Sequence, residues 1–183
     1  MQVALRLLAE GGCHALTIRN IACELGITEP AIYRHFGSKK ELLMALYGYV
    51  WLRLKEEVLP LAEGEENAAE RLRRLMKGTF SFLSKNRGVN LVLLSEAIHH
   101  NDPDLKEAMF RLVSGFQHRL KEILLQGVRE GLFRTDLDPD VASRGVMGFI
   151  QSTLILSLLR GGEWEMENGI NQFLSIFFKG IER

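Results

Sequence analysis

Two short helical segments joined by a tight turn, within residues 17–42, constrain the fold of this chain most strongly. The apolar positions of the first segment recur at helical spacing: Ile18, Ile21, Ala22 and Leu25. Thr17 precedes them as a cap, and Gly26 follows where a left-handed residue can end a helix. The second segment starts at Thr28, another capping residue, and tolerates Pro30 because an amide hydrogen in a first turn has no helical partner. The pattern predicts helix, turn, helix.

The second segment has two different faces. Ile32 and Phe36 fall on one face, where they can pack. The opposite face carries Pro30, Ala31 and Arg34. We therefore expect one face to be buried and the other to be presented to solvent.

A third helix is predicted to begin after Gly37, where Ser38 and Glu41 form a capping box. Lys39 and Lys40 lie in its first turn, where the helix dipole disfavours positive charge. A phosphate would be held there by a lysine and by the free amide hydrogens together. This detail favours a DNA-binding unit over a packing motif.

The spacing of these residues resembles that of a known family. The positions that carry the resemblance follow one another without gaps: Thr17, Ile21, Ala22, Leu25, Gly26, Ile27, Pro30, Ala31, Ile32, Tyr33, His35, Phe36, Ser38, Lys39 and Leu42. They resemble the helix-turn-helix of the tetracycline-repressor (TetR) family of transcriptional regulators. The motif spans only about 30 residues, but it combines many more positions than a generic helix-turn-helix pattern.

The resemblance implies a ligand-responsive regulator, most simply a repressor, that binds a palindromic operator as a homodimer and is released by a small effector. It implies an all-α fold with a three-helix DNA-binding domain at residues 1–46 and a helical effector-binding and dimerisation domain at residues 47–183. Similar families carry a basic arm and a full first turn before the segment that begins here at Met1. We therefore expect a shortened start with fewer phosphate contacts.

Side-chain chemistry suggests a role for each expected DNA contact. Arg34 suits guanine, Glu29 can accept from cytosine, and Pro30 or Ala31 can touch a thymine methyl. Residues assigned to phosphates would fix the register: Thr17, Tyr33, His35 and Lys39. Arg19 fits either role, and Thr28 completes the expected DNA-binding set.

A competing interpretation is that Tyr33 and His35 simply cover the small core, but it gives no use to Arg34 or Lys39. The charge balance is also modest. The chain carries no net charge, and residues 1–45 hold five basic and four acidic side chains, a net of plus one. Any DNA affinity must therefore come from a local patch.

The rest of the chain predicts further helices, consistent with 46% hydrophobic residues and four prolines. Their expected ranges are 3–10, 38–59, 68–85, 89–100, 103–130, 139–160 and about 170–181. The helix that leaves the DNA-binding unit ends before Pro60, and a shift at its far end would move the region near Lys39. A basic cluster, Arg71, Arg73, Arg74 and Lys77, is interpreted as a solvated face, with nucleic acid binding as the minor alternative.

The resemblance implies an effector pocket between this connecting helix and the helices that follow it. The expected lining residues are Trp51, Phe80, Met109, Phe110 and Phe116. They fit a plain hydrophobic core equally well. Because few charges fall on these stripes, an apolar small molecule is the favoured effector.

The last two helices expose more apolar surface than a single chain can cover. Residues 139–160 are apolar around most of the circumference, with Gly145, Gly148 and Ser152 forming a flat strip. The final helix is similarly apolar. This pattern predicts a homodimer through a four-helix interface, as the resemblance also implies for the last two helices.

The sequence argues against an enzyme. Glu96 and His99 form an ExxH step like those of di-iron bundles, but such sites need a second copy and further glutamates. Neither a glycine-rich phosphate loop, a nucleophile elbow nor zinc-ligand spacing occurs. We therefore predict no catalytic residue, metal or cofactor. His99, His100 and His118 are interpreted as solvated, with a metal or polar effector as the alternative.

The two cysteines, Cys13 and Cys23, lack CxxC spacing, and no secretory leader accompanies them. Reduced thiols in a cytoplasmic protein are expected, with a redox-sensing pair as the minor alternative. The longest apolar run, residues 149–159, is too short to span a bilayer. A helical protein-interaction module without specific DNA binding remains the alternative function.

Overall fold

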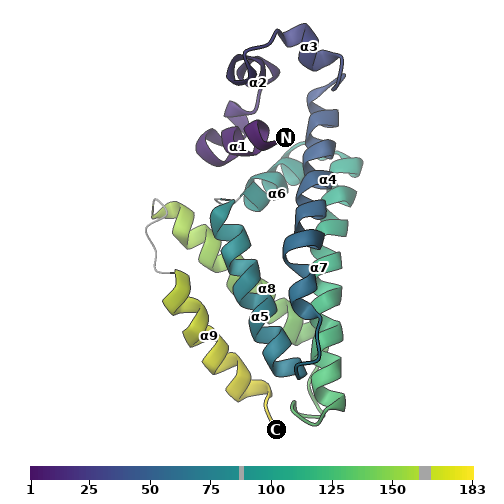
Figure 1. The fold of residues 1–183 in the computed structure, drawn as a ribbon, viewed down its shortest axis with the longest axis vertical. Helices are drawn as coiled ribbons and strands as arrows, with labels where there is room; N and C mark the ends of the chain where they lie inside the picture. The colour runs from purple at the N-terminus through teal and green to yellow at the C-terminus, as the bar shows by residue number, and fades with distance from the viewer. Residues whose placement is uncertain (87–88, 161–165) are drawn as a thin grey trace. The chain divides into compact units, whose positions relative to one another are not determined.

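A computed structural model describes residues 1–86, 89–160 and 166–183. Within those residues the regular structure is helical, apart from one isolated β-bridge between Phe133 and Glu182 (Figure 1). The all-α prediction is confirmed. The chain divides into two compact units, which are described separately below.

The first unit comprises residues 1–53 and 86–112. Its helices are α1 (Gln2–Ala15), α2 (Ile18–Leu25), α3 (Glu29–Tyr33), the first part of α4 (Lys39–Glu57), α6 (Val89–His99) and the start of α7 (Pro103–Arg129). Helix α1 packs on α2 and on α6, and α2 packs on α3. Fully buried leucines, among them Leu8, Leu16 and Leu46, form its core. The buried hydroxyl of Tyr47 donates to the carbonyl of Leu93 at 2.6 Å and joins α4 to α6.

The second unit comprises residues 54–85 and 113–183. It contains the ends of α4 and α7, the short 3-10 helix η1 (Leu59–Ala62), α5 (Ala68–Lys85), α8 (Pro139–Leu159) and α9 (Met166–Ile181). Helix α5 packs on η1, α8 and α9, and α8 also packs on α9. The interior is built from residues such as Leu72, Leu75 and Phe133, whose side chains are fully buried.

Most predicted helices are present, and α5 begins and ends where the sequence predicted. The predicted stop at Gly11 and Gly12 is confirmed in the backbone, because Gly12 has non-helical angles, with φ 61° and ψ −159°. A short helical piece that was not predicted follows this break and takes α1 to Ala15. Helix α4 ends at Glu57, and Pro60 lies in η1. The predicted break at Gly88 and the predicted helix end at Gly161 and Gly162 lie outside the described residues.

Helix α8 is buried on one side only in the single chain. Val146, Ile150 and Leu154 pack inward, whereas Ile155 and Leu159 are exposed. One copy of the chain therefore leaves part of the apolar surface of α8 uncovered, as the sequence pattern predicted. In length and composition α8 is also apolar enough to cross a membrane, a property that core helices of soluble proteins share.

Candidate DNA interface

The turn between α2 and α3 is built by local hydrogen bonds. The side-chain oxygen of Thr17 accepts from the amide of Asn20 at 3.0 Å and caps α2. Gly26 adopts φ 65° at the end of α2, a left-handed conformation that costs glycine little. The amide of Ile27 then donates to the carbonyl of Ala22 at 3.0 Å. These bonds confirm the predicted cap and turn.

Helix α3 is short and held by a single buried side chain, Ile32. Thr28 occupies the N-cap position in extended conformation, although its side chain makes no capping hydrogen bond. The helix ends at Tyr33, so Arg34 is its C-cap residue rather than part of its last turn. The amide of Phe36 still donates to the carbonyl of Ile32, which continues the turn beyond the helix.

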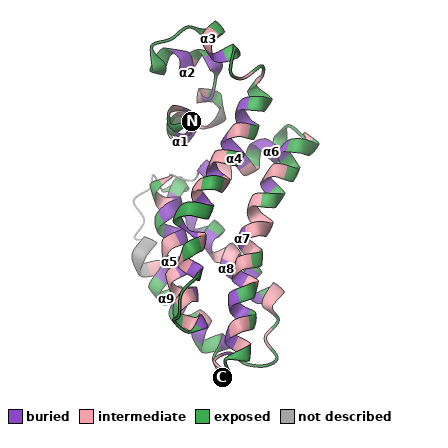
Figure 2. Cartoon of the chain, turned by 45° about the vertical axis from the view of Figure 1, so that its right-hand side comes forward, coloured by how far each residue is buried: buried purple, intermediate pink, exposed green. Residues whose placement is uncertain are grey.

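The surface around α3 is open to solvent. Residues 23–40 are exposed except for the buried Ile32 and three partly buried residues, and Figure 2 shows exposed residues predominating from the end of α2 through α3. Nine of the ten expected DNA-binding residues are exposed, and Ala31 is intermediate. Within the part of the chain that is described, no side-chain hydrogen bond or ion pair engages Arg19, Arg34 or His35. Their polar groups are available to a ligand.

Lys39 and Lys40 have structural partners that the sequence did not reveal. The ammonium of Lys39 lies 3.6 Å from a carboxylate oxygen of Glu96 on α6. The ammonium of Lys40 lies 2.8 Å from a carboxylate oxygen of Asp102 and 2.6 Å from one of Asp104, at the start of α7. The pKa of Lys40 is raised chiefly by its hydrogen bond to Asp102 and next by its hydrogen bond to Asp104. The hydrogen bond from Lys40 in turn lowers the pKa of the Asp102 carboxyl.

Lys39 therefore has a partner within the protein, although it does not cover the small core. Carboxylates of α6 and α7 compensate for lysines placed against the dipole of α4, so a phosphate is not needed to explain them. The sequence could not show this, because it does not tell which distant acidic residues pack beside the first turn of α4.

The capping box at the start of α4 is present in altered form. The hydroxyl of Ser38 accepts from the amide of Glu41 at 3.2 Å, as predicted. The carboxylate of Glu41 reaches the amide of Gly37 at 2.8 Å rather than that of Ser38. The two side chains still satisfy two backbone donors, which fixes the corner between α3 and α4.

The predicted effector-lining residues fall in different units. Trp51, Met109 and Phe110 belong to the first unit, and Phe80 and Phe116 to the second. Met109, Phe80 and Phe116 are buried. Phe110 is 66% exposed in the single chain, so its place in an effector pocket remains a prediction.

An aromatic stack that the sequence analysis did not single out lies in the second unit. Phe149 of α8 and Phe173 of α9 stack with ring centroids 3.8 Å apart. Phe80 of α5 approaches Phe149 at 5.8 Å, and Phe177 approaches Phe173 at 5.5 Å. The i, i+4 spacing of Phe173 and Phe177 was the available signal, but their partner on α8 required the fold.

A groove of about 580 Å³ lies in the first unit, between His14 of α1, Lys39 and one face of α6. Glu96 is 7% exposed, and its carboxylate lies 3.0 Å from His100. His118 pairs with Glu122 at 3.4 Å. Among the described residues no group of three His, Cys, Asp or Glu side chains is placed to hold a metal ion. Cys23 is exposed and unpaired as a thiol.

The fold and this surface define a helix-turn-helix DNA-binding regulator with a larger helical C-terminal part. A model described as "Bacterial regulatory proteins, tetR family" matches residues 1–46. Another, "Tetracyclin repressor-like, C-terminal domain", matches residues 65–181. The chain belongs to the TetR family, and it is a DNA-binding transcriptional regulator and not an enzyme.

Similar proteins cover nearly the whole chain. The HTH-type transcriptional repressor KstR2 of Mycobacterium tuberculosis is 27% identical over 197 residues, which cover 100% of this chain and 91% of the relative. Its solved structure matches with a TM-score of 0.74, covering 100% of this chain and 92% of that one.

A second relative, the fatty acid metabolism regulator protein of Bacillus subtilis, is 23% identical over 99% of this chain and 93% of its own length. A transcriptional regulator from Saccharomonospora viridis, solved in complex with choline, is 28% identical with a TM-score of 0.84. That match covers 100% of this chain and 95% of the solved one.

Proposed function

We propose that this regulator represses transcription by binding a palindromic operator as a homodimer, and that a small apolar effector releases it. The observation that carries the proposal is the exposure of α3 and its flanks, with only Ile32 buried. Within this proposal residues 1–46 form the DNA-binding domain and residues 47–183 the effector-binding and dimerisation domain.

Base contacts are assigned to Arg34, Glu29, Pro30 and Ala31, and phosphate contacts to Thr17, Tyr33, His35 and Lys39. Arg19 and Thr28 complete the set. Support comes from the exposure of these side chains and from the absence, in the described residues, of acidic partners for Arg19 and Arg34. Lys39 must exchange Glu96 for a phosphate when DNA binds.

Dimerisation through α8 and α9 is supported by apolar surface on both helices. Leu159 on α8 is 78% exposed and Ile176 on α9 is 73% exposed. Gly145 and Gly148 are exposed on α8, and a Cβ atom at either would meet nothing within 4 Å. Glycine inside a helix costs about 1 kcal/mol relative to alanine, so a close approach by a second copy gives these positions a purpose.

An apolar effector is supported by two of the three named relatives. The Mycobacterium tuberculosis relative is a ketosteroid transcriptional regulator and the Bacillus subtilis relative is a fatty acid metabolism regulator, and ketosteroids and fatty acids are apolar molecules. The Saccharomonospora viridis protein, in contrast, was solved with choline, which is a cation. The aromatic stack of Phe149 and Phe173 and the buried Phe80 and Phe116 offer apolar surface in the second unit. Helix α4, which contributes to both units, is the element through which a signal would reach Lys39. Because the proposed function is binding to an operator, we place the protein in the cytoplasm.

The direct test is a titration of the full chain with a library of labelled duplexes at two salt concentrations. Steep salt dependence together with an enriched inverted repeat supports the regulator. Binding without enrichment at either salt concentration would favour a helical interaction module. Adding a steroid, a fatty acyl compound or choline to the enriched complex then tests release, which the proposal predicts for an apolar compound and not for choline.

A further inference from the structure

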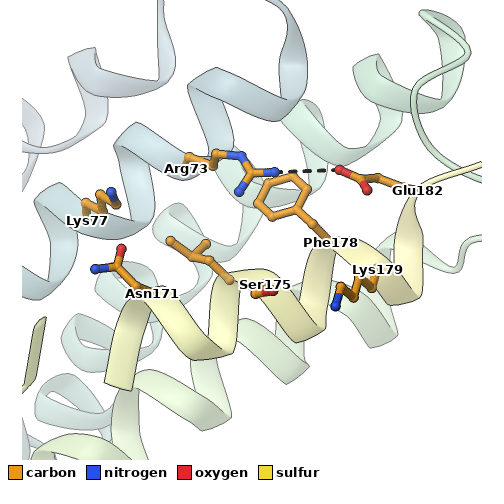
Figure 3. A pocket seen from close by; sticks show the side chains of 8 residues that line it. Arg73, Lys77, Asn171, Ser175, Phe178, Lys179 and Glu182 are labelled. Carbon is orange, nitrogen blue, oxygen red and sulfur yellow. Dashed lines mark ion pairs between the residues drawn. The ribbon is translucent and has the colours of Figure 1, made fainter. Parts of the chain in front are cut away.

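A groove of about 250 Å³ between α5 and α9 carries a concentration of positive charge outside the DNA interface. Its floor is formed by Leu174 and Phe178 of α9. Three basic side chains surround it, Arg73 and Lys77 from α5 and Lys179 from α9. Figure 3 shows Arg73 lying across Phe178, with Lys77 and Asn171 toward one end of the groove and Glu182 toward the other.

Arg73 is held in a fixed orientation. Its guanidinium carbon lies 3.7 Å from the centroid of the Phe178 ring, a cation–π contact. One of its nitrogens lies 3.6 Å from a carboxylate oxygen of Glu182, which is too long for a hydrogen bond. The stacked guanidinium therefore keeps N–H donors available, in the planar arrangement that suits phosphate or carboxylate oxygens.

The two lysines of the groove have no such anchor. In the described ranges neither Lys77 nor Lys179 takes part in an ion pair or side-chain hydrogen bond. Arg73, Lys77 and Lys179 against Glu182 leave a net charge of plus two in the groove, although the whole chain has a net charge of zero. A phosphate monoester carries about −1.5 to −2 near neutral pH and matches that charge.

The neighbouring arginines of α5, Arg71 and Arg74, differ from the two lysines in having partners outside the groove. Arg74 pairs with Glu66 at 2.5 Å and donates to the carbonyl of Leu61 at 2.8 Å, and Arg71 lies 3.8 Å from Glu130. Those two side chains hold the segment around η1 in place. The basic cluster of α5 is therefore not one solvated face, because it divides into a structural pair and a pair that lines the groove.

We propose that this groove binds a small phosphorylated molecule through Arg73, Lys77 and Lys179. The hydroxyl of Ser175 and the amide of Asn171 add neutral donors beside the charges. The volume suits a phosphate group with a small organic part. The site is separate from the operator and effector functions proposed above, so its failure would leave them untouched.

Isothermal titration calorimetry of the full chain with pyrophosphate, against chloride at equal ionic strength, tests the proposal. We expect saturable binding of one pyrophosphate per chain. Lys77→Gln and Lys179→Gln should each weaken it about five-fold, the effect of losing one exposed charge-assisted contact. Lys85→Gln, on the same helix but outside the groove, should change it less than about two-fold.

Two outcomes would overturn the proposal. The first is unspecific binding of pyrophosphate. It would show as a titration heat that never saturates, or as binding that Lys85→Gln weakens as much as the groove variants do, and either would indicate general ionic screening. The second is nucleic acid binding: a loss of affinity for a random duplex in Lys77→Gln and Lys179→Gln, with pyrophosphate binding unchanged. Affinity for the duplex is expected to stay the same in both groove variants.

Discussion

Arg34 is the side chain from which most of the sequence preference is expected. It follows α3 directly, is exposed, and has no ion-pair partner among the described residues. Arg34→Ala should cost about 1 to 3 kcal/mol on the enriched operator and relax the preference at one base pair. Fluorescence anisotropy on the operator and its single-base variants measures both effects. Arg111→Ala is a control, since Arg111 is exposed but paired with Glu107. If Arg34→Ala lowered the affinity for operator and random DNA equally, the assignment of Arg34 to a base would be contradicted.

Lys39 and Lys40 form a matched pair in the same helical turn. Lys39 is held by one carboxylate at 3.6 Å, whereas Lys40 is held by two at closer range. Lys39→Ala should weaken binding to all sequences alike and reduce the slope of affinity against salt by about one, the contribution of one phosphate contact. Lys40→Ala should leave that slope unchanged. The same slope in Lys39→Ala as in the unchanged protein would show that Glu96 keeps this lysine away from DNA.

For single residues, the sequence predicted which polar side chains would be exposed, but not their intramolecular partners. Thr17, Gly26 and Ser38 act within a few residues of themselves, so local spacing sufficed to predict their roles. The pairing of Lys39 with Glu96 joins residues 57 positions apart in the chain, and only tertiary packing creates it.

At the scale of the helices, α7 contains a glycine in close contact with a buried ring. A Cβ atom added to Gly127 would lie 2.1 Å from ring atoms of Phe133, which is fully buried. Gly127→Ala should lower the free energy of unfolding by about 1 to 3 kcal/mol through overpacking. Chemical denaturation followed by circular dichroism measures it. Gly48→Ala, on α4 where a Cβ meets nothing within 4 Å, should be neutral or stabilising, and equal destabilisation of both variants would contradict the packing argument.

Helices were predictable because their apolar stripes have a clear period, as in α5, where Leu72, Leu75 and Met76 are all buried. The break in α1 at Gly12 was predictable from the two adjacent glycines, whereas the helical piece that follows it to Ala15 was not. The exposure of Phe110 could not be predicted, because an apolar residue at the edge of a stripe can face either way.

For the whole molecule, the exposed apolar residues of α8 and α9 predict that the protein is a dimer. Ile155→Glu combined with Ile176→Glu should convert it to a monomer, because charges would be buried without partners across the interface. Sedimentation velocity gives the oligomeric state. Ile98→Glu is the control, since Ile98 on α6 is 63% exposed. A doubly substituted protein that still sediments as a dimer would place the interface elsewhere.

We propose that two copies of α3 enter successive major grooves on one side of a duplex. Hydroxyl-radical footprinting of the full chain on its enriched operator tests this most directly. We expect two protected regions related by a two-fold axis, with centres about 10 base pairs, or a multiple of that, apart. A single protected region, or two that remain when Ile155→Glu and Ile176→Glu have removed the dimer, would contradict it.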